Sequence, residues 1–274
     1  MLFRSKKKYI GMLTIFILLA FAGTGLASPF GTDITIFDKN SSSNYGWYSK
    51  REDNEVEPGT EAHQRWDMEG FYVKNNKLTM VGGFDFKDGV AAPRDRRAGS
   101  DRVWTGGDLF VSISGEPRFG DIHSSNGVKT VTNKYGYDYV FDINASDMTY
   151  TLYQIDQASL VKTAYFGVNE GSNPWEYASG GTETGISGDL EFEELGVLEG
   201  LNGRFHYTLG FDLAGILGDI GEDGAFFHYT MECGNDNLMG YMEGSTSVPE
   251  PATMLLLGTG IIGLAAFSRR RLLK

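Results

Sequence analysis

The chain has 274 residues, and its charge and cysteine content exclude several classes of protein. Residues 1–27 hold four of its 24 cations and no acid, and residues 248–274 hold four cations and one of its 36 acids. Residues 28–247 therefore keep 16 cations and 35 acids, a net charge of -19. So acidic a body argues against binding to nucleic acid, whose phosphates need Lys and Arg, and against docking on anionic lipid. Cys233 is the single cysteine, which excludes an intramolecular disulfide and a multi-cysteine zinc site.

Residues 1–27 have the pattern of a secretory signal peptide. A basic start precedes an apolar run from Ile10 to Ala22, and small residues follow it. This pattern predicts cleavage between Ala27 and Ser28. The alternative is a retained membrane anchor, for which the apolar run is short.

The first half of the body shows alternating strand patterns separated by turns. The first strand is predicted where Ile34 and Ile36 alternate with polar residues, and a hairpin is predicted to turn at Asn75-Asn76. Tyr137, Tyr139 and Phe141 are expected on one face of a later strand. The predicted segments are a strand at 28–38, a polar loop at 40–59, a hairpin at 71–81, a charged loop at 87–101, and strands at 108–114, 135–143 and 150–155.

The second half continues the same pattern, and no segment keeps a helical period over ten residues. Its predicted segments are a strand at 160–168, a glycine-rich loop at 171–188, strands at 190–195 and 204–213, a short apolar turn at 213–217, an acidic loop at 218–224 and a closing strand at 226–233. Strands joined by turns predict an all-β fold, a single antiparallel, jelly-roll-like β-sandwich. We expect the sandwich to cover residues 61–245, with residues 28–60 adding an N-terminal strand and a polar loop.

The order of these segments resembles the carbohydrate-binding β-sandwiches of the family 9 type and their DOMON-like relatives. In those modules a Gly-Asp-led strand, here Gly107 to Ser114, lies in the sandwich. A long strand, a short apolar turn and a closing strand ending in Asn-Asp come last, as in Phe205 to Asp236. This chain has Phe211-Asp212-Leu213 where those modules usually have an Ile-Pro step. The resemblance implies a body that binds carbohydrate.

Few residues of the body suggest catalysis. No two of the four histidines have metal-ligand spacing, although His206 and His228 lie in alternating strands and are possible neighbours. The favoured interpretation is that both histidines are polar residues on a strand face. Cys233 is expected to be a small buried hydrophobic residue.

Asp189, Glu191 and Glu194 resemble the carboxylate arrangement of jelly-roll glycosidases, with an altered order. Retaining hydrolysis needs two carboxyl groups about 5 Å apart, and Asp189 and Glu191 on one strand face would suit that separation. An exposed acidic strand edge is the favoured alternative.

Calcium is the only cofactor that the acidic loops suggest. Asp219, Glu222 and Asp223 share one loop, and Asp142, Asn144 and Asp147 share another. Calcium takes six to eight oxygen ligands, but neither loop has EF-hand spacing and both are ordinary turn compositions, which is the favoured interpretation. We otherwise expect no cofactor.

Aromatic residues in polar loops are the best candidates for ligand binding: Trp47, Trp104, Trp175 and Tyr177. Sugar rings present apolar faces that stack on such side chains. The alternative is that each Trp folds under its loop and caps the core. A stacked pair of exposed aromatics would favour binding, whereas a pocket with two carboxylates of separated pKa would favour an enzyme.

Residues 246–274 have the pattern of a membrane-anchoring tail. Val248, Pro249, Glu250 and Pro251 come first, an apolar stretch covers about 252–268, and a basic tail with Arg269, Arg270 and Arg271 follows. The stretch is at the lower limit for a transmembrane helix. The positive-inside rule places both basic ends in the cytoplasm and the body on the other side of the membrane.

This tail resembles the PEP-CTERM sorting signal, which some domain catalogues call the ice-binding protein C-terminal domain. The resemblance implies a Gram-negative bacterium whose exosortase recognises Pro249 to Pro251 and processes the tail. It also implies an association with exopolysaccharide and biofilm. We therefore expect a non-catalytic protein whose precursor is anchored in the inner membrane, with its body in the periplasm, before it reaches the cell surface or matrix. The expected partners are exosortase and a neutral polysaccharide, and the alternative function is a secreted carbohydrate-active hydrolase.

Overall fold

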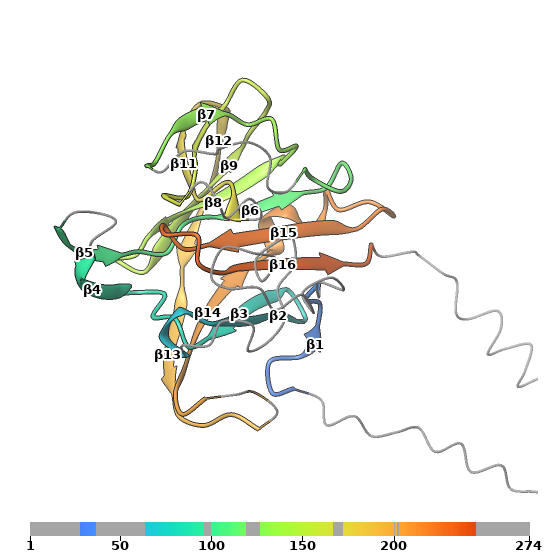
Figure 1. Ribbon diagram of the computed structural model, residues 1–274. Coiled ribbons are helices and arrows are strands. Elements are labelled where there is room, and N and C mark those ends of the chain that lie inside the picture. The colour runs from blue at the N-terminus through green and yellow to red at the C-terminus, as the bar shows by residue number, and fades with distance from the viewer. Residues whose placement is uncertain are drawn as a thin grey trace, which may run out of the picture.

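Antiparallel strands stacked in layers make up most of the body (Figure 1). The computed structural model describes residues 28–36, 64–95, 100–118, 127–166, 172–199, 201 and 203–244. The predicted all-β sandwich is confirmed: two large sheets pack face to face, and a small third sheet covers part of the second. The predicted signal peptide, the loop at 40–59 and the C-terminal tail lie outside the described residues.

The first large sheet has five strands in the order β1-β2-β3-β14-β13. The predicted hairpin forms β2 and β3, and Asn75 in its turn has a φ of 58°, the left-handed conformation that Asn tolerates better than most residues. The strands cover Thr32–Asp33 (β1), Met68–Lys74 (β2), Lys77–Gly82 (β3), His206–Asp212 (β14) and Glu191–Leu195 (β13).

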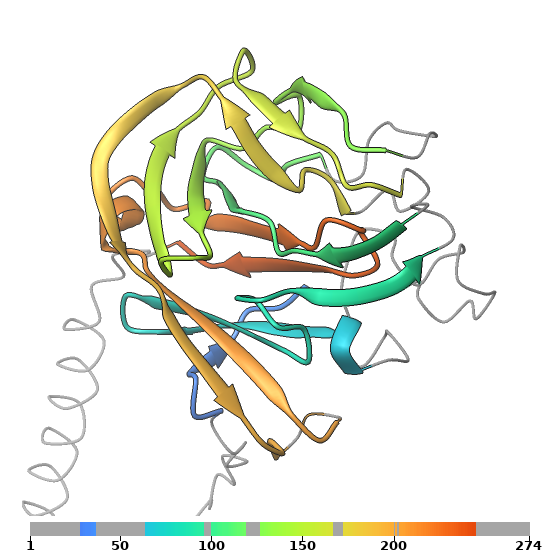
Figure 2. The ribbon, with the colours of Figure 1, turned by 90° about the vertical axis from the view of Figure 1, so that its left-hand side faces the viewer.

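The second large sheet has six strands in the order β12-β9-β8-β6-β15-β16. Its strands cover Thr182–Asp189 (β12), Thr149–Gln154 (β9), Tyr139–Asn144 (β8), Leu109–Ser112 (β6), Ala225–Thr230 (β15) and Asn237–Met242 (β16). β12 and β13 follow each other through the buried Leu190, and Figure 2 shows this stretch arching from one large sheet to the other. A stretch of chain shared between two sheets makes a corner of the sandwich.

Two apolar clusters follow from the alternation of side chains along the strands. The main core lies between the two large sheets and includes Phe71, Leu209 and Phe141. The second cluster includes Phe110, Val140 and residues of the small sheet, so it lies on the other face of the six-stranded sheet. The small sheet has the order β11-β10-β7, with Glu176–Ser179 (β11), Leu160–Lys162 (β10) and Thr130–Thr132 (β7).

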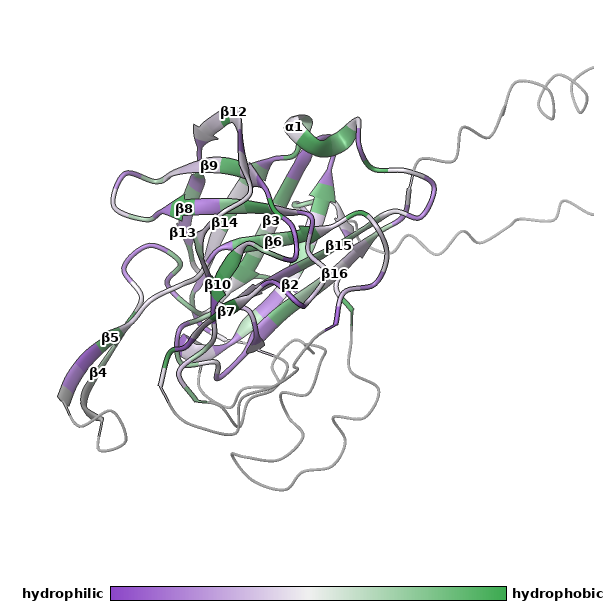
Figure 3. Ribbon diagram, turned by 90° about the horizontal axis from the view of Figure 1, so that it is seen from above, coloured by the Kyte–Doolittle hydropathy of each residue, from purple (hydrophilic) through white to green (hydrophobic). Residues whose placement is uncertain are grey.

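The N-terminal segment closes one side of the sandwich. β1 pairs with β2, and residues 34–36 then bond to β16, with Tyr241 N–H to Ile34 O at 2.8 Å and Ile36 N–H to Met239 O at 2.9 Å. The segment after β1 and the last described strand therefore meet at one seam between the large sheets. The remaining elements are a 3-10 turn at Gln64–Trp66, α1 at Ala214–Leu217, and a hairpin of β4 (Val90–Asp95) and β5 (Ser100–Trp104) that projects from the body (Figure 3).

Several sequence-based expectations are corrected. The glycine-rich stretch predicted as a loop contains β11 and nearly all of β12, and the charged stretch at 87–101 contains all of β4 and the start of β5. The closing strand at 226–233 is not the last strand, because β16 follows it and pairs with it. Tyr137 packs in the second cluster, whereas Tyr139 and Phe141 pack in the main core, because Tyr137 lies before β8 begins.

Candidate functional site

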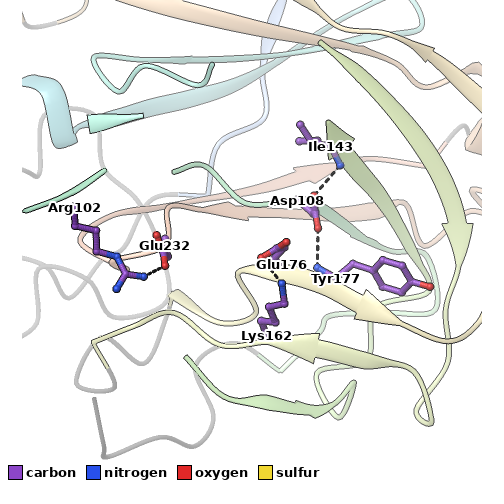
Figure 4. Close-up of polar contacts among 7 residues, drawn as sticks. All are labelled: Arg102, Asp108, Ile143, Lys162, Glu176, Tyr177 and Glu232. Carbon is purple, nitrogen blue, oxygen red and sulfur yellow. Dashed lines mark hydrogen bonds and ion pairs between the residues drawn. The ribbon is translucent and has the colours of Figure 1, made fainter. Parts of the chain in front are cut away.

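Asp108 joins the six-stranded sheet to the small sheet. Its carboxylate is 2% exposed; Oδ1 accepts a hydrogen bond from Ile143 N–H at 2.8 Å, and Oδ2 accepts one from Tyr177 N–H at 2.7 Å (Figure 4). The neighbouring Gly107 permits this contact, because a Cβ there would lie 1.9 Å from Trp175 O. The result is a fixed position for β11 against the sheet.

Charged side chains surround Asp108 and its two backbone hydrogen bonds. Burial raises the pKa of Asp108 well above its usual range, and the charges of Asp142 and Glu176 raise it further, against the two backbone N–H groups. Burial and the charge of Glu176 also raise the pKa of the half-buried Asp142, while Lys162 lowers it. Lys162 Nζ lies 2.9 Å from Glu176 Oε2, and these two residues are paired across β10 and β11 (Figure 4).

Tyr153 and Tyr177 form a stacked aromatic pair beside these charges. Their ring centroids are 4.9 Å apart with an interplanar angle of 29°, and both side chains are half-buried. Tyr153 comes from β9 and Tyr177 from β11, so the pair bridges the six-stranded sheet and the small sheet. Burial raises the pKa of both tyrosine hydroxyls. Glu183 and Asp142 raise the pKa of Tyr153 further, and Tyr153 and Asp142 raise that of Tyr177, so both hydroxyls stay protonated.

Tyr177 is held at two points. Its backbone N–H donates to Asp108, and its hydroxyl donates to Gly180 O. A ring that is already fixed loses little rotamer freedom when a ligand stacks on it. Asp142 acts on both tyrosines, so the pair offers an apolar ring face next to a hydrogen-bond acceptor. We call Tyr153, Tyr177 and Asp142 the tyrosine surface.

The structure corrects the expectation for the tryptophans. Trp104 is 1% exposed and packs against Tyr165 and Phe166, and Trp175 is 8% exposed. Both therefore follow the alternative in which the ring folds under its loop, and neither offers a face for stacking on a ligand. Trp47 lies outside the described residues. Of the predicted aromatic residues, Tyr177 is the one that the structure places at a half-exposed surface.

Trp104 has a structural partner in Arg102. The guanidinium carbon of Arg102 lies 4.4 Å from the Trp104 ring centroid and 4.9 Å from that of Tyr165, and the side chain forms an ion pair with Glu232 (Figure 4). Cation–π contacts of this kind favour Arg over the faces of Trp and Tyr. This cluster anchors the projecting β4–β5 hairpin to the loop after β15.

His206 and His228 are not neighbours, because β14 and β15 belong to different sheets and each histidine alternates with residues of the main core, which places the two on opposite outer faces. His206 Nε2 lies 3.2 Å from Glu69 Oε1, and both side chains are fully buried. His228 Nε2–H donates to Pro174 O at 3.0 Å, and the ring stacks on Tyr137. Burial lowers the pKa of His228 to about 4. Cys233 is buried in the main core, as expected.

The carboxylates considered for hydrolysis are separated by the fold. Asp189 ends β12 in the six-stranded sheet, and Glu191 begins β13 in the five-stranded sheet, so the two do not share a strand face. Glu191 forms an ion pair with Lys77, and Glu194 is exposed. Because β12 and β13 are edge strands of their sheets, these acids are the exposed acidic edge that was favoured.

The predicted calcium candidates Asp219, Glu222 and Asp223 are all exposed. Asp219 Oδ2 accepts a hydrogen bond from Tyr139 Oη at 2.7 Å. In the second loop, Asn144 donates to Asp147 at 2.9 Å, as in an ordinary turn. Among the residues that the structure describes, no three or more His, Cys, Asp or Glu side chains are grouped so as to hold a metal ion.

Sequence reasoning missed Tyr153 and Asp108. The available signal for Tyr153 was its alternation with Tyr150 and Leu152, which places it on the face of β9 opposite the main core. The signal for Asp108 was weaker, because an acid at the start of a strand is usually exposed. Its burial depends on β11, which was predicted as a loop.

Comparison with known proteins identifies the C-terminal tail. Residues 247–271 match the model of the PEP-CTERM protein-sorting motif. No curated protein and no solved structure matches the chain significantly. Within the described part of the chain, no helix is long and apolar enough to span a membrane. The chain thus ends in a PEP-CTERM sorting motif, which implies recognition by an exosortase and export through a membrane-anchored precursor that is processed to the cell surface.

Proposed function

We propose that this exosortase-sorted protein is a non-catalytic component of the surface or extracellular matrix of a Gram-negative bacterium. In this proposal the β-sandwich binds a neutral polysaccharide of the biofilm through the tyrosine surface. The stacked, half-exposed Tyr153–Tyr177 pair is the observation on which the binding role rests.

The sorting signal and the charge pattern support the location. The matched motif includes Pro249, Glu250 and Pro251, and basic residues flank the apolar stretches at both ends of the chain. Cleavage after Ala27 would leave the first described residue, Ser28, at the new N-terminus. β1 begins at Thr32, so its contacts with β2 would survive the removal of the signal peptide.

The geometry of the tyrosine surface supports saccharide binding. The ring faces are apolar, and Asp142 and the two tyrosine hydroxyls supply acceptors and donors for hydroxyl groups. Each stacked ring should contribute about 1 kcal/mol, which gives affinities in the micromolar to millimolar range for a single chain. Many copies in a matrix would convert such weak binding into useful avidity.

The state of Asp108 argues for binding rather than hydrolysis. Asp108 and Asp142 are the carboxylates with raised pKa values near the tyrosine surface. Asp108 is buried and both of its oxygens accept hydrogen bonds from backbone N–H groups, so it cannot approach a glycosidic bond. Asp142 is the half-exposed carboxyl with a raised pKa that remains beside the ring pair.

The sorting part of the proposal is tested in the tail. Glu250→Ala with Pro251→Ala should leave the unprocessed precursor in the inner membrane, with the acidic body in the periplasm. The control is Glu243→Ala, which removes an acid close to β16 but outside the matched motif. Processing and export of the double variant at the wild-type level would refute the sorting role of this triplet.

The binding part is tested with neutral hexasaccharides such as cellohexaose and laminarihexaose, with and without calcium. Tyr153→Ala with Tyr177→Ala should weaken binding about thirtyfold, since two rings at about 1 kcal/mol each are lost. Tyr153→Phe with Tyr177→Phe keeps both ring faces and is the matched control. Equal affinities of the Ala and wild-type proteins would exclude the tyrosine surface, and release of reducing sugar would support the hydrolase instead.

A further inference from the structure

A groove of about 480 Å³ opens on the five-stranded sheet, at the turn between β2 and β3. Lys77, Thr79 and Glu191 contribute to its lining. Thr79 lies between Leu78 and Met80, which face the main core, so Thr79 and Lys77 point to the outer face of the sheet. The groove is therefore on the side of the sandwich opposite the tyrosine surface, which covers the outer face of the six-stranded sheet.

Phe30 forms an aromatic wall of this groove. It is half-buried, and its ring centroid lies 5.8 Å from that of Tyr72 on β2. A tight turn fixes the backbone around it, with Gly31 N–H to Ser28 O at 3.0 Å and Phe30 N–H to Ser28 Oγ at 3.3 Å. As at Tyr177, hydrogen bonds fix the backbone that carries a half-buried aromatic ring.

The polar groups of the groove are mixed and balanced in charge. Two cations, Lys74 and Lys77, and two acids, Glu191 and Asp212, belong to its lining. Lys77 and Glu191 form an ion pair, and the side-chain amides of Asn75 and Asn76 line the groove beside them. A balanced site does not select an ion by net charge, but its alternating donors and acceptors suit a ligand rich in hydroxyl groups.

We propose that this groove is a second saccharide-binding site, so that one molecule cross-links two neutral polysaccharide chains. The ligand class follows from the groove itself, which combines an apolar ring face with amides and a paired Lys–Glu. The cross-linking role also rests on the proposed function, because it needs the tyrosine surface on the opposite face. Two sites on opposite faces of one body cannot both engage one short saccharide, so each would hold a different segment or a different chain.

The test uses the processed, exported protein and follows backbone amide signals by NMR during titration with cellohexaose and laminarihexaose. The Asn75 and Asn76 signals should shift, and they should still shift in the Tyr153→Ala, Tyr177→Ala protein. Phe30→Ala should weaken the groove titration about tenfold without affecting signals of β9 and β11. Phe205→Ala is the matched control, because Phe205 also packs on a tyrosine of the five-stranded sheet, with ring centroids 6.0 Å apart, but does not line the groove.

Cross-linking is measured as the viscosity of a soluble mixed-linkage β-glucan, whose chains carry the linkages of both hexasaccharides. Wild-type protein should raise it, and Phe30→Ala or the double tyrosine variant should each abolish the rise. If Phe30→Ala disturbs the fold, Glu191→Gln removes the ion pair at an exposed position and should weaken the groove titration instead. Unmoved Asn75 and Asn76 signals with both hexasaccharides would overturn the groove site and leave the tyrosine surface standing. Shifts at Asn75 and Asn76 with none at Tyr153 and Tyr177 would do the reverse, and would overturn cross-linking.

Discussion

The backbone N–H of Tyr177 donates a hydrogen bond of 2.7 Å to Oδ2 of Asp108, which lies 69 residues earlier in the chain. Asp108 is in the six-stranded sheet layer, and Tyr177 is in the small sheet that covers it. Burying a carboxylate costs folding free energy, and the raised pKa of Asp108 reflects that cost. The presence of Asp108 indicates that the position of β11, and with it the ring of Tyr177, depends on this contact.

We therefore expect Asp108→Ala to act on both stability and ligand binding. The variant leaves the N–H groups of Ile143 and Tyr177 without a partner, which should cost about 2–4 kcal/mol of unfolding free energy. Release of β11 should also weaken cellohexaose binding, although Asp108 is too deeply buried to contact it. Chemical denaturation and calorimetric titration measure the two effects.

Asp138→Ala is the matched control for this prediction. Asp138 also accepts backbone N–H groups, from Ile113 at 2.8 Å and Ser114 at 2.9 Å, but these donors follow β6 and do not belong to β11. It should lower stability and leave the affinity for cellohexaose unchanged. Equal losses of affinity in both variants would show that general destabilisation, rather than the position of Tyr177, accounts for the effect.

The sequence predicted the fold class and many of the strands because their side chains alternate clearly. The hairpin at Asn75-Asn76 and the strands around Phe141, Leu152 and Phe211 each pack one face into the main core. β12 has the sequence TETGISGD, in which every residue is exposed or half-buried, so no apolar face marks it. It forms because it pairs with β9 across many residues, and such long-range pairing is not visible in a local pattern.

The candidate site was harder to predict for the same reason. Trp104 and Trp175 lie in polar stretches, yet a segment distant in sequence covers each of them. Tyr165 and Phe166 pack on Trp104, and the backbone at Gly107 lies against Trp175. Tyr153 and Tyr177 meet only because the small sheet folds over the six-stranded one. Residue type suggested aromatic stacking, but tertiary packing decides which rings reach the surface.

His228 predicts a specific dependence of stability on acid. Burial lowers its pKa from an ordinary value of about 6.5 to about 4, so the folded protein keeps the ring neutral. Above pH 6.5 neither state binds this proton, and the stability is fully present. Between pH 6.5 and pH 4 the unfolded state takes up the proton first, which should remove about 3 kcal/mol of unfolding free energy.

The measurement is urea denaturation of the wild type and His228→Phe at several pH values. The variant keeps an aromatic ring against Tyr137 and Met239, and should lose less stability between pH 6.5 and pH 4. The raised pKa of Asp108 acts in the opposite direction, since its contribution is lost as pH rises, but both proteins contain it. Parallel stability curves for the two proteins would contradict this role of His228.

A substitution at Gly240 tests how closely the N-terminal segment and β16 must pack to close the sandwich. A Cβ at this position would lie 2.9 Å from Cδ2 of Phe71, whose ring is fully buried in the main core. Gly240→Ala should therefore force the core and β16 apart and cost about 1–3 kcal/mol. Amide exchange should rise at Ile36 and Tyr241, which form the seam with β16.

Gly218→Ala is the matched control for this substitution. Gly218 has a helical φ of -69°, and a Cβ there would meet no atom within 4 Å. The change should be neutral or slightly stabilising, because Ala loses less backbone freedom than Gly on folding. If Gly240→Ala leaves amide exchange at Ile36 and Tyr241 unchanged, the N-terminal segment tolerates a wider gap.

The shared corner at Leu190 predicts that the body unfolds as one unit. Leu190 is buried between β12 and β13, and its backbone N–H donates to Met148 O at 2.7 Å, so each large sheet is tied to the other through the chain itself. Leu190→Ala should cost about 2–4 kcal/mol of unfolding free energy and lower the melting temperature by about 5–15 °C for a body of this size.

The transition should remain single, because both sheets contribute to the main core and neither can bury its apolar face alone. Calorimetry measures the transition, and limited proteolysis provides the second measurement. Two separate transitions, or two stable proteolytic fragments, would show that the body does not unfold as one unit.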